Sequence, residues 1–270
     1  MAEEKWLLDG PKTIDVENIR RLKVGLIRGQ VDIIGHDEPG ARVEVHSVSG
    51  RDLKVAVVGD TLEIDYPQLR WDNWIEAFKS FRGSASADVS IVVPRDVALK
   101  LGVVSASGLI SGLREDASIS TVSGDLTIDG LRGDLQLNSV SGELSVRNHQ
   151  GRVTAHTVSG DITVAGEVDA FNCDGVSGEV MLDLAGTPDE VRINTVGGRV
   201  TARLEADAAT SYTIATVSGR LQLDATRITA LRGRWTGKFG ELDKHWVDFR
   251  VNTVSGDVSV VHAARATASA

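Results

Sequence analysis

The chain contains few of the residues that mark disulfide-stabilised or membrane-embedded proteins. Its 270 residues include one cysteine, five prolines, two methionines and twelve aromatic residues. A single cysteine excludes an internal disulfide and any metal site built from several thiolates. No stretch reaches the roughly 18 apolar residues that span a bilayer, and the N-terminus lacks the basic start and apolar run of a signal peptide. We therefore expect a cytoplasmic protein.

The charge balance argues against a nucleic-acid partner. There are 29 basic and 38 acidic side chains, which give a formal net charge of -9. A chain of this sign has no overall field that attracts phosphate backbones. What the sequence has in excess is glycine, with 28 residues, together with Val, Ser, Thr and Asp. This mixture is typical of many short strands joined at glycine corners.

A short motif recurs along the chain at a nearly constant spacing. Ser/Thr-Val-Ser-Gly or a close variant ends at nine glycines, and from Gly108 to Gly219 the spacings are 16, 18, 18, 18, 20 and 21 residues. Each period divides into two stretches of alternating polar and apolar residues, which indicate half-buried strands and exclude a helix. One coil cannot bury its own apolar row, so coils must stack. The predicted fold is an all-β β-solenoid (β-helix) with two strands in each coil of 18 to 20 residues.

The alternation within the motif predicts which side chains face the core. We expect the valine to point inward, and the preceding Thr or Ser and the following Ser to point outward. The glycine provides either a positive φ or room for close backbone approach. The predicted inward row is Val122, Val140, Val158, Val176, Val196, Val217 and Val254. The predicted outward rows are Thr121, Ser139, Thr157, Thr195, Thr216 and Thr253, then Ser123, Ser141, Ser159, Ser177 and Ser218.

Two windows interrupt the repeat, at residues 66–82 and 227–250, and together they hold nine of the twelve aromatic residues. In the first window the aromatic residues follow helical spacing. The predicted organisation is an N-terminal cap or extension at 1–23, irregular leading strands at 24–66, an aromatic helical insertion at 67–83, the β-solenoid at 84–262 and a disordered tail at 263–270.

The aromatic windows have two interpretations. In the first, they cap the solenoid, because an open end would expose unpaired strand edges. In the second, some rings stay exposed and dock a partner protein or a membrane interface, both of which favour Trp beside Arg or Lys. The candidate partner-binding residues are Trp71, Trp74, Phe78, Phe81, Trp235 and Phe239.

The tandem TVSG-acidic coils follow the segment DVSIVVPRDVALKLGVVSASGLISG. Over residues 88–261, and more loosely from Val24, the chain resembles the bacterial putative-adhesin family that is also called the toastrack domain. The resemblance implies a β-solenoid and offers no catalytic residues. It also implies an association with membrane-stress and envelope-sensing systems, in which some members carry a transmembrane segment.

The residues themselves favour a non-enzymatic protein without a cofactor or metal. The six histidines lack metal-ligand spacing, and Arg51, Arg199 and Arg220 directly follow motif glycines, where a calcium-binding β-roll needs acidic ligands. The expected function is an interaction or scaffold protein with a protein partner, itself membrane-associated in one version of this hypothesis. One alternative is a self-assembling structural protein. The other is a carbohydrate-active β-helix enzyme with carboxylates such as Asp125 and Asp161 on one face.

Overall fold

The computed structural model describes residues 4–67 and 85–263. All regular structure within these ranges is β-strand, and the described residues contain no helix. The predicted all-β solenoid is thereby confirmed, whereas the predicted helical insertion lies almost wholly in residues 68–84, outside the described residues. The chain divides into two compact units, residues 1–136 (unit 1) and residues 137–270 (unit 2).

Unit 1 is built from short strands whose apolar residues alternate with polar ones, as a wall with one buried face requires. Its strands are β1 (Glu4–Leu8), β2 (Lys12–Val16), β3 (Arg21–Leu26), β4 (Arg28–His36), β5 (Ala41–Ser49), β6 (Leu53–Val58), β7 (Thr61–Asp65), β8 (Ser86–Pro94), β9 (Ala98–Val103), β10 (Ser107–Ser111), β11 (Ala117–Thr121) and β12 (Leu126–Asp129).

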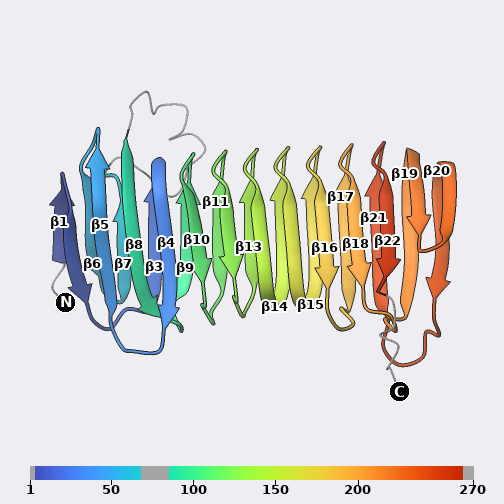
Figure 1. Ribbon diagram of the computed structural model, residues 1–270, viewed down its shortest axis with the longest axis horizontal. Helices are drawn as coiled ribbons and strands as arrows, with labels where there is room; N and C mark the ends of the chain where they lie inside the picture. Colours follow the sequence, from blue (N-terminus) through green and yellow to red (C-terminus); the bar gives the residue numbers. More distant parts are fainter. Residues whose placement is uncertain (1–3, 68–84, 264–270) are drawn as a thin grey trace, which may run out of the picture. The chain divides into compact units, whose positions relative to one another are not determined.

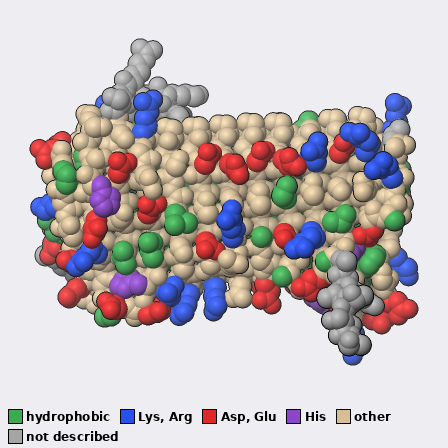
Figure 2. Space-filling view, in the orientation of Figure 1, with side chains coloured by type: hydrophobic (Ala, Val, Ile, Leu, Met, Phe, Trp, Pro, Cys, Tyr) green, Lys and Arg blue, Asp and Glu red, His purple; other side chains and the backbone are tan. Residues whose placement is uncertain are grey.

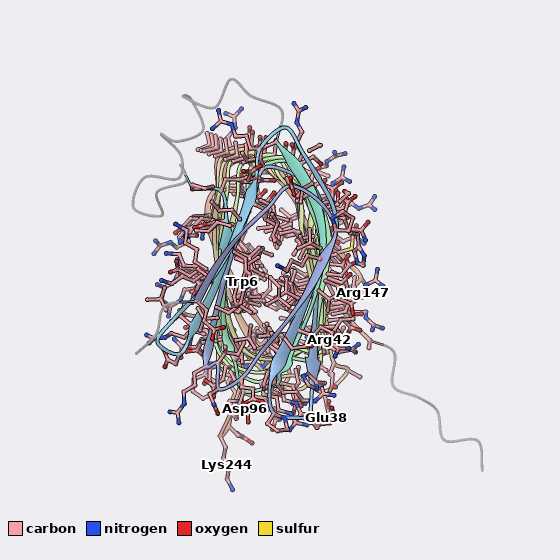
Figure 3. The ribbon with its side chains drawn as sticks, turned by 90° about the vertical axis from the view of Figure 1, so that its left-hand side faces the viewer. Trp6, Glu38, Arg42, Asp96, Arg147 and Lys244 are labelled. Carbon is pink, nitrogen blue, oxygen red and sulfur yellow. The ribbon has the colours of Figure 1, made fainter. Side chains whose placement is uncertain are left out.

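These strands form two walls. Hydrogen-bonded neighbours in one wall follow the order β1, β6, β7, β3, β9, β11, and those in the other follow the order β2, β5, β8, β4, β10, β12. The inner layers pair in parallel and the outermost ones antiparallel. β3 and β4 form one layer of the stack, and the next strands in the chain, β5 and β6, lie two layers away. β7 and β8 follow in sequence and occupy the layer between them. Figure 3 looks along the stack at this end of unit 1, with Trp6 of β1 labelled.

Unit 2 continues the coil pattern with longer strands that round a corner. Its strands are β13 (Leu135–Ser139, which begins before the unit boundary), β14 (Leu144–Thr157), β15 (Ile162–Gly175), β16 (Val180–Leu184), β17 (Glu190–Thr195), β18 (Val200–Leu204), β19 (Thr210–Leu223), β20 (Thr226–Phe239), β21 (Val247–Thr253) and β22 (Val258–His262).

The final coil of unit 2 is inserted into the stack rather than added to its end. β17 and β18 pair in parallel with β21 and β22, which in turn pair in parallel with β19. β19 pairs antiparallel with β20 on its other side. The chain therefore skips one layer after β18, builds the β19–β20 hairpin, and returns to fill the empty layer with β21 and β22 (Figure 1).

The apolar core lies between the two walls of each unit. Strand residues on the inner face are almost completely buried, as for Ile33 and Ile91 in unit 1 and Phe171, Ile193 and Phe249 in unit 2, all at 0% exposure. Strands stacked about 4.8 Å apart align equivalent residues of successive coils. Burial of these rows is the main favourable contribution to folding.

The predicted orientation of the motif is wrong at its first two residues. The Thr or Ser that precedes the valine is buried in every copy named above, at 0 to 8% exposure. The valines lie outward, part-exposed at Val122 and 37 to 63% exposed at the other six positions. The motif serines are exposed, as predicted. The alternation thus places valine on the surface of the corner and the hydroxyl side chain inside it.

The reason for this orientation is the hydrogen-bonding requirement of the corner. Thr121 Oγ1 donates to the carbonyl oxygen of Gly124 (2.8 Å) and accepts from the Gly124 N–H (2.9 Å). The same short loop closes at Thr253, whose Oγ1 accepts from the Gly256 N–H at 2.8 Å. A buried backbone group without a partner costs about 1 to 3 kcal/mol. A valine at the inner position could not supply these bonds.

The motif glycines are required by close approach of successive coils. A Cβ atom at Gly124 would lie 1.9 Å from the Ala106 carbonyl oxygen, and one at Gly178 would lie 2.0 Å from the Gly160 oxygen. Neither glycine has a positive φ. At these corners the structure therefore shows that glycine is needed for close backbone approach and not for a positive φ.

Candidate functional site

The outermost strand of unit 2 differs in charge from the rest of the chain. β20 contains Arg227, Arg232, Arg234 and Lys238 and no acidic residue, although the whole chain has a net charge of -9. Basic side chains gather over β19 and β20 at the right-hand end of the view in Figure 2. This end of unit 2 is the candidate functional site.

Two residues with positive φ allow β20 to follow β19 around the corner. Asp224 (φ 48°) makes the turn between the two strands, and Gly233 (φ 97°) lies opposite Thr216 at the corner itself. Aspartate adopts this region more readily than most residues, and glycine does so without a steric penalty. The 14-residue strand therefore covers the end of both walls.

The inward side of β20 closes the apolar core. Trp235 lies opposite the buried Ile214 in the antiparallel register, and residues opposite one another share a face. Its ring centroid is 6.3 Å from that of Tyr212, which makes an edge contact with Phe249 at 5.8 Å. The indole also covers Gly237, where a Cβ would come within 2.2 Å of the ring. Trp235 is part-exposed, so one side of the ring remains accessible.

The two ends of β20 meet at one histidine. The ring of Phe239 stacks on His262 with centroids 3.5 Å apart and an interplanar angle of 11°. His262 Nδ1 lies 2.9 Å from Asp224 Oδ2, and the His262 backbone N–H donates to Asp224 Oδ1 at 2.7 Å. These contacts attach the turn before β20 and the last residue of β20 to β22. The terminal strand is therefore fixed to the layer that was inserted beneath its partner β19.

Two of the six predicted partner-binding residues can be located. The structure brings Trp235 and Phe239 to the same side of one strand, and both are part-buried. The other four, Trp71, Trp74, Phe78 and Phe81, lie outside the described residues. A role in binding a partner stays a prediction for all six.

The outward side of β20 carries the charge. Arg234 lies opposite Ala215 and Lys238 lies opposite Ser211 in the β19–β20 register, with the exposed Thr236 between them. Both basic side chains are exposed. Within the part of the chain that the structure describes, neither of them forms an ion pair.

Several arginines elsewhere in the described chain form ion pairs. In unit 2, Arg203 donates two hydrogen bonds to Asp183 at 2.7 and 2.8 Å, which raise the pKa of that arginine. Other pairs of unit 2 are Arg192–Glu190, Arg199–Glu179, Arg220–Asp257 and Arg250–Asp248. Exposed pairs of this kind stabilise a fold only slightly, but they neutralise the surface on which they lie.

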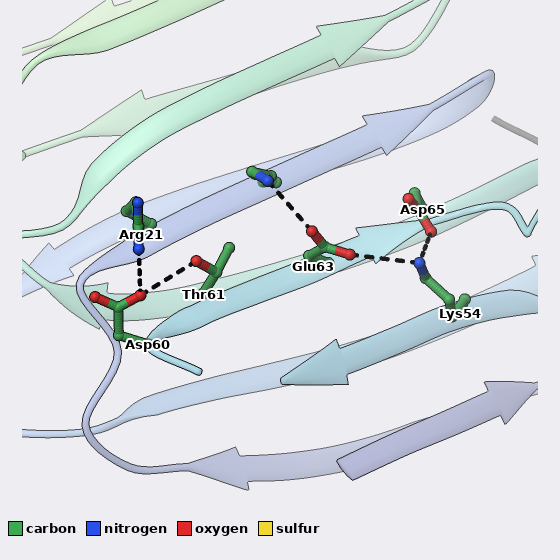
Figure 4. Close-up of polar contacts among 7 residues, drawn as sticks. Arg21, Lys54, Asp60, Thr61, Glu63 and Asp65 are labelled. Carbon is green, nitrogen blue, oxygen red and sulfur yellow. Dashed lines mark hydrogen bonds and ion pairs between the residues drawn. The ribbon is translucent and has the colours of Figure 1, made fainter. Parts of the chain in front are cut away.

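Figure 4 shows the same neutralisation on β3, β6 and β7 of unit 1. There, Lys54 bridges Glu63 and Asp65 at 3.5 and 3.0 Å, and Arg21 pairs with Asp60 at 2.6 Å. β20 differs from these strands because its four basic residues have no acidic residue on the same strand. From the sequence, the aromatic residues of this window were selected as binding candidates because Arg and Lys lie beside them, whereas the absence of any acidic residue over the 14 positions of β20 was not used.

Cys173 and Asp161, one of the two carboxylates named for a β-helix enzyme, have structural surroundings. Cys173 is 2% exposed, and burial raises the pKa of its thiol to about 12, so it is a poor nucleophile. Asp161 accepts a hydrogen bond from the Glu179 backbone N–H at 2.7 Å, which links it to the next coil. Among the described residues, no group of three or more His, Cys, Asp or Glu side chains is placed to hold a metal ion.

The family model described as Toastrack DUF4097 matches residues 19–261, which is most of the chain and includes both units. The chain belongs to the Toastrack family. Among curated proteins, no sequence matches it closely. None of the described residues forms a helix that could cross a membrane.

Solved structures match the chain at low sequence identity. A putative adhesin from Bacteroides fragilis matches with a TM-score of 0.50 and 11% identity, over 93% of this chain and 98% of that one. A putative lipid binding protein from Parabacteroides distasonis matches with a TM-score of 0.48 and 15% identity, over 94% and 97% of the two chains. A putative cell adhesion protein from Clostridium sporogenes matches with a TM-score of 0.29 and 12% identity, over 94% and 100%. The first of these supports the fold.

Proposed function

We propose that this Toastrack protein is a non-enzymatic interaction protein, which presents a rigid β-solenoid surface to a protein partner of the bacterial cell envelope. The observation that carries the proposal is the end of unit 2, where exposed cations and a part-exposed tryptophan share one strand. Surfaces that bind proteins are enriched in Trp and Arg. The family and the adhesin of the same fold support an interaction role.

Self-assembly of the solenoid into filaments is the second candidate, because β20 pairs with β19 alone among the described strands. Against it stands the antiparallel hairpin at this end, which differs from the parallel stacking of regular coils. Like charges on two copies of β20 would also repel.

The test is crosslinking in the native cell, followed by purification of the tagged chain and mass spectrometry. The expected result is a small set of envelope proteins that is lost with the Arg234→Gln, Lys238→Gln double variant of β20. The loss of these envelope proteins counts only if the variant chain itself is recovered at the wild-type level. Fractionation of the same cells tests the predicted cytoplasmic location. Recovery of the chain crosslinked only to itself would overturn the proposal in favour of self-assembly.

A further inference from the structure

No described strand lies along the outer edge of β20. Among the described strands, β20 is hydrogen-bonded to β19 alone, so the backbone groups on its other edge have no strand partner. An open edge of this length accepts an additional extended chain, whose main-chain hydrogen bonds provide affinity. Of the 14 residues of β20, those from Gly233 to Phe239 run alongside Thr210–Thr216 without a register shift, and this half is the regular part of the edge.

The side chains beside this edge define the charge of an added strand. Arg234 and Lys238 lie on the outward face four positions apart, with Arg232 exposed at the corner next to them. A strand added to β20 would place its own alternate residues directly across from this row. Acidic residues at those positions would form cross-strand pairs, whereas basic ones would be repelled.

The same charges select against a second copy of the chain. Pairing of two β20 edges would bring four cations of one copy against four of the other, since each strand has four basic and no acidic residues. Lysine and arginine on an edge strand are a common protection against such pairing. This repulsion does not act against a strand of opposite charge. The edge of β20 therefore disfavours pairing with a second copy of β20 and favours pairing with an acidic segment.

We infer that the Gly233–Phe239 edge of β20 binds an extended acidic segment of a partner protein as an additional β-strand, with acidic side chains facing Arg234 and Lys238. The inference rests on the proposed function and specifies its partner. A peptide satisfies the open backbone groups and the cations together. An anionic membrane surface would satisfy the cations and leave the strand edge unpaired.

The experiment uses a fluorescent peptide in which Glu and Thr alternate. Fluorescence anisotropy measures the binding of this peptide to the whole 270-residue chain. The protein variant is Arg234→Gln, Lys238→Gln. Its matched control is Arg147→Gln, Arg152→Gln, which removes two exposed arginines of β14 in the same unit. The peptide controls are one with Lys in place of Glu and one with N-methylated amides along one edge. Anionic phosphatidylserine vesicles are tested in parallel.

The expected result is binding of the Glu peptide that weakens about tenfold in the β20 variant and stays unchanged in the β14 variant. Binding should also fall with salt and be lost with both control peptides. If peptide binding weakens equally in the two variants, or if the N-methylated peptide binds fully, general electrostatic attraction explains the binding. Either result would overturn strand addition. Binding of vesicles but not of the peptide would overturn it in favour of a membrane. If the peptide fails while crosslinking still recovers a protein partner, this inference falls and the proposed function stands.

Discussion

The buried hydroxyl at each corner of the solenoid makes a sharp prediction about stability. Thr121 is completely buried, and its Oγ1 makes two hydrogen bonds to the backbone of Gly124, at 2.8 and 2.9 Å. Thr121→Val keeps the shape of the side chain and removes both bonds. With a net contribution of about 0.5 to 1.5 kcal/mol for each bond, we expect a loss of about 2 kcal/mol in the free energy of unfolding.

The neighbouring residue provides the control. Val122 is part-exposed, so Val122→Thr should change the free energy of unfolding by no more than about 0.5 kcal/mol. Urea denaturation followed by circular dichroism measures the free energy of unfolding of both variants. With an m-value of about 2 kcal/mol/M, the urea midpoint of Thr121→Val should fall by about 1 M. A larger loss for Val122→Thr than for Thr121→Val would refute the reasoning, because that order requires valine to face the core.

Three further predictions concern single positions. Gly178→Ala should destabilise strongly, because a Cβ there would lie 2.0 Å from a carbonyl oxygen of the adjacent coil, whereas Gly10→Ala, with no atom within 4 Å of its Cβ, should leave the urea midpoint almost unchanged. Cys173 should not react with a thiol reagent at pH 8 until guanidinium unfolds the chain, because burial raises its pKa to about 12; reaction at the same rate before and after unfolding would contradict this. Hydrogen bonding to Arg220 lowers the pKa of Asp257 below its ordinary value of 3.8. The pair therefore stabilises the fold at pH values above 3.8, and this stabilisation is lost as the pH falls through the lowered pKa. The difference in unfolding free energy between wild type and Arg220→Gln should therefore shrink on acidification, and a difference that grows would be inconsistent with the pairing.

The repeat could be identified from the sequence because it has both a period and an alternation. Each TVSG-like copy marks a corner, and the apolar residues that follow, such as Leu126 and Ile128, are buried as the alternation predicts. The orientation of the motif itself could not be obtained in this way. Hydrophobicity places Val122 inside, but a corner bends the strand and leaves backbone groups to be satisfied, so the hydroxyl of Thr121 takes the inner position.

The order of the layers was also beyond the sequence pattern. The 37 residues between Gly219 and Gly256 resemble two periods with one degenerate copy, yet they contain an antiparallel strand and a return to an earlier layer. Nothing in local alternation distinguishes a strand added to the end from one inserted between two others. The site at β20 follows from this topology, since only the hairpin makes its cationic strand the outermost one.

Insertion of the last coil has a consequence for synthesis on the ribosome. A regular solenoid can extend one coil at a time as the chain emerges, because each coil needs only the coil before it. Here β19 and β20 are made before β21 and β22, the layer on which β19 rests. The hairpin must wait undocked until Val258–His262 has left the exit tunnel, and a chain that stops at residue 246 would present an unfilled layer. We therefore expect chains that stop before β21 to be cleared by proteases more rapidly than chains that include both β21 and β22.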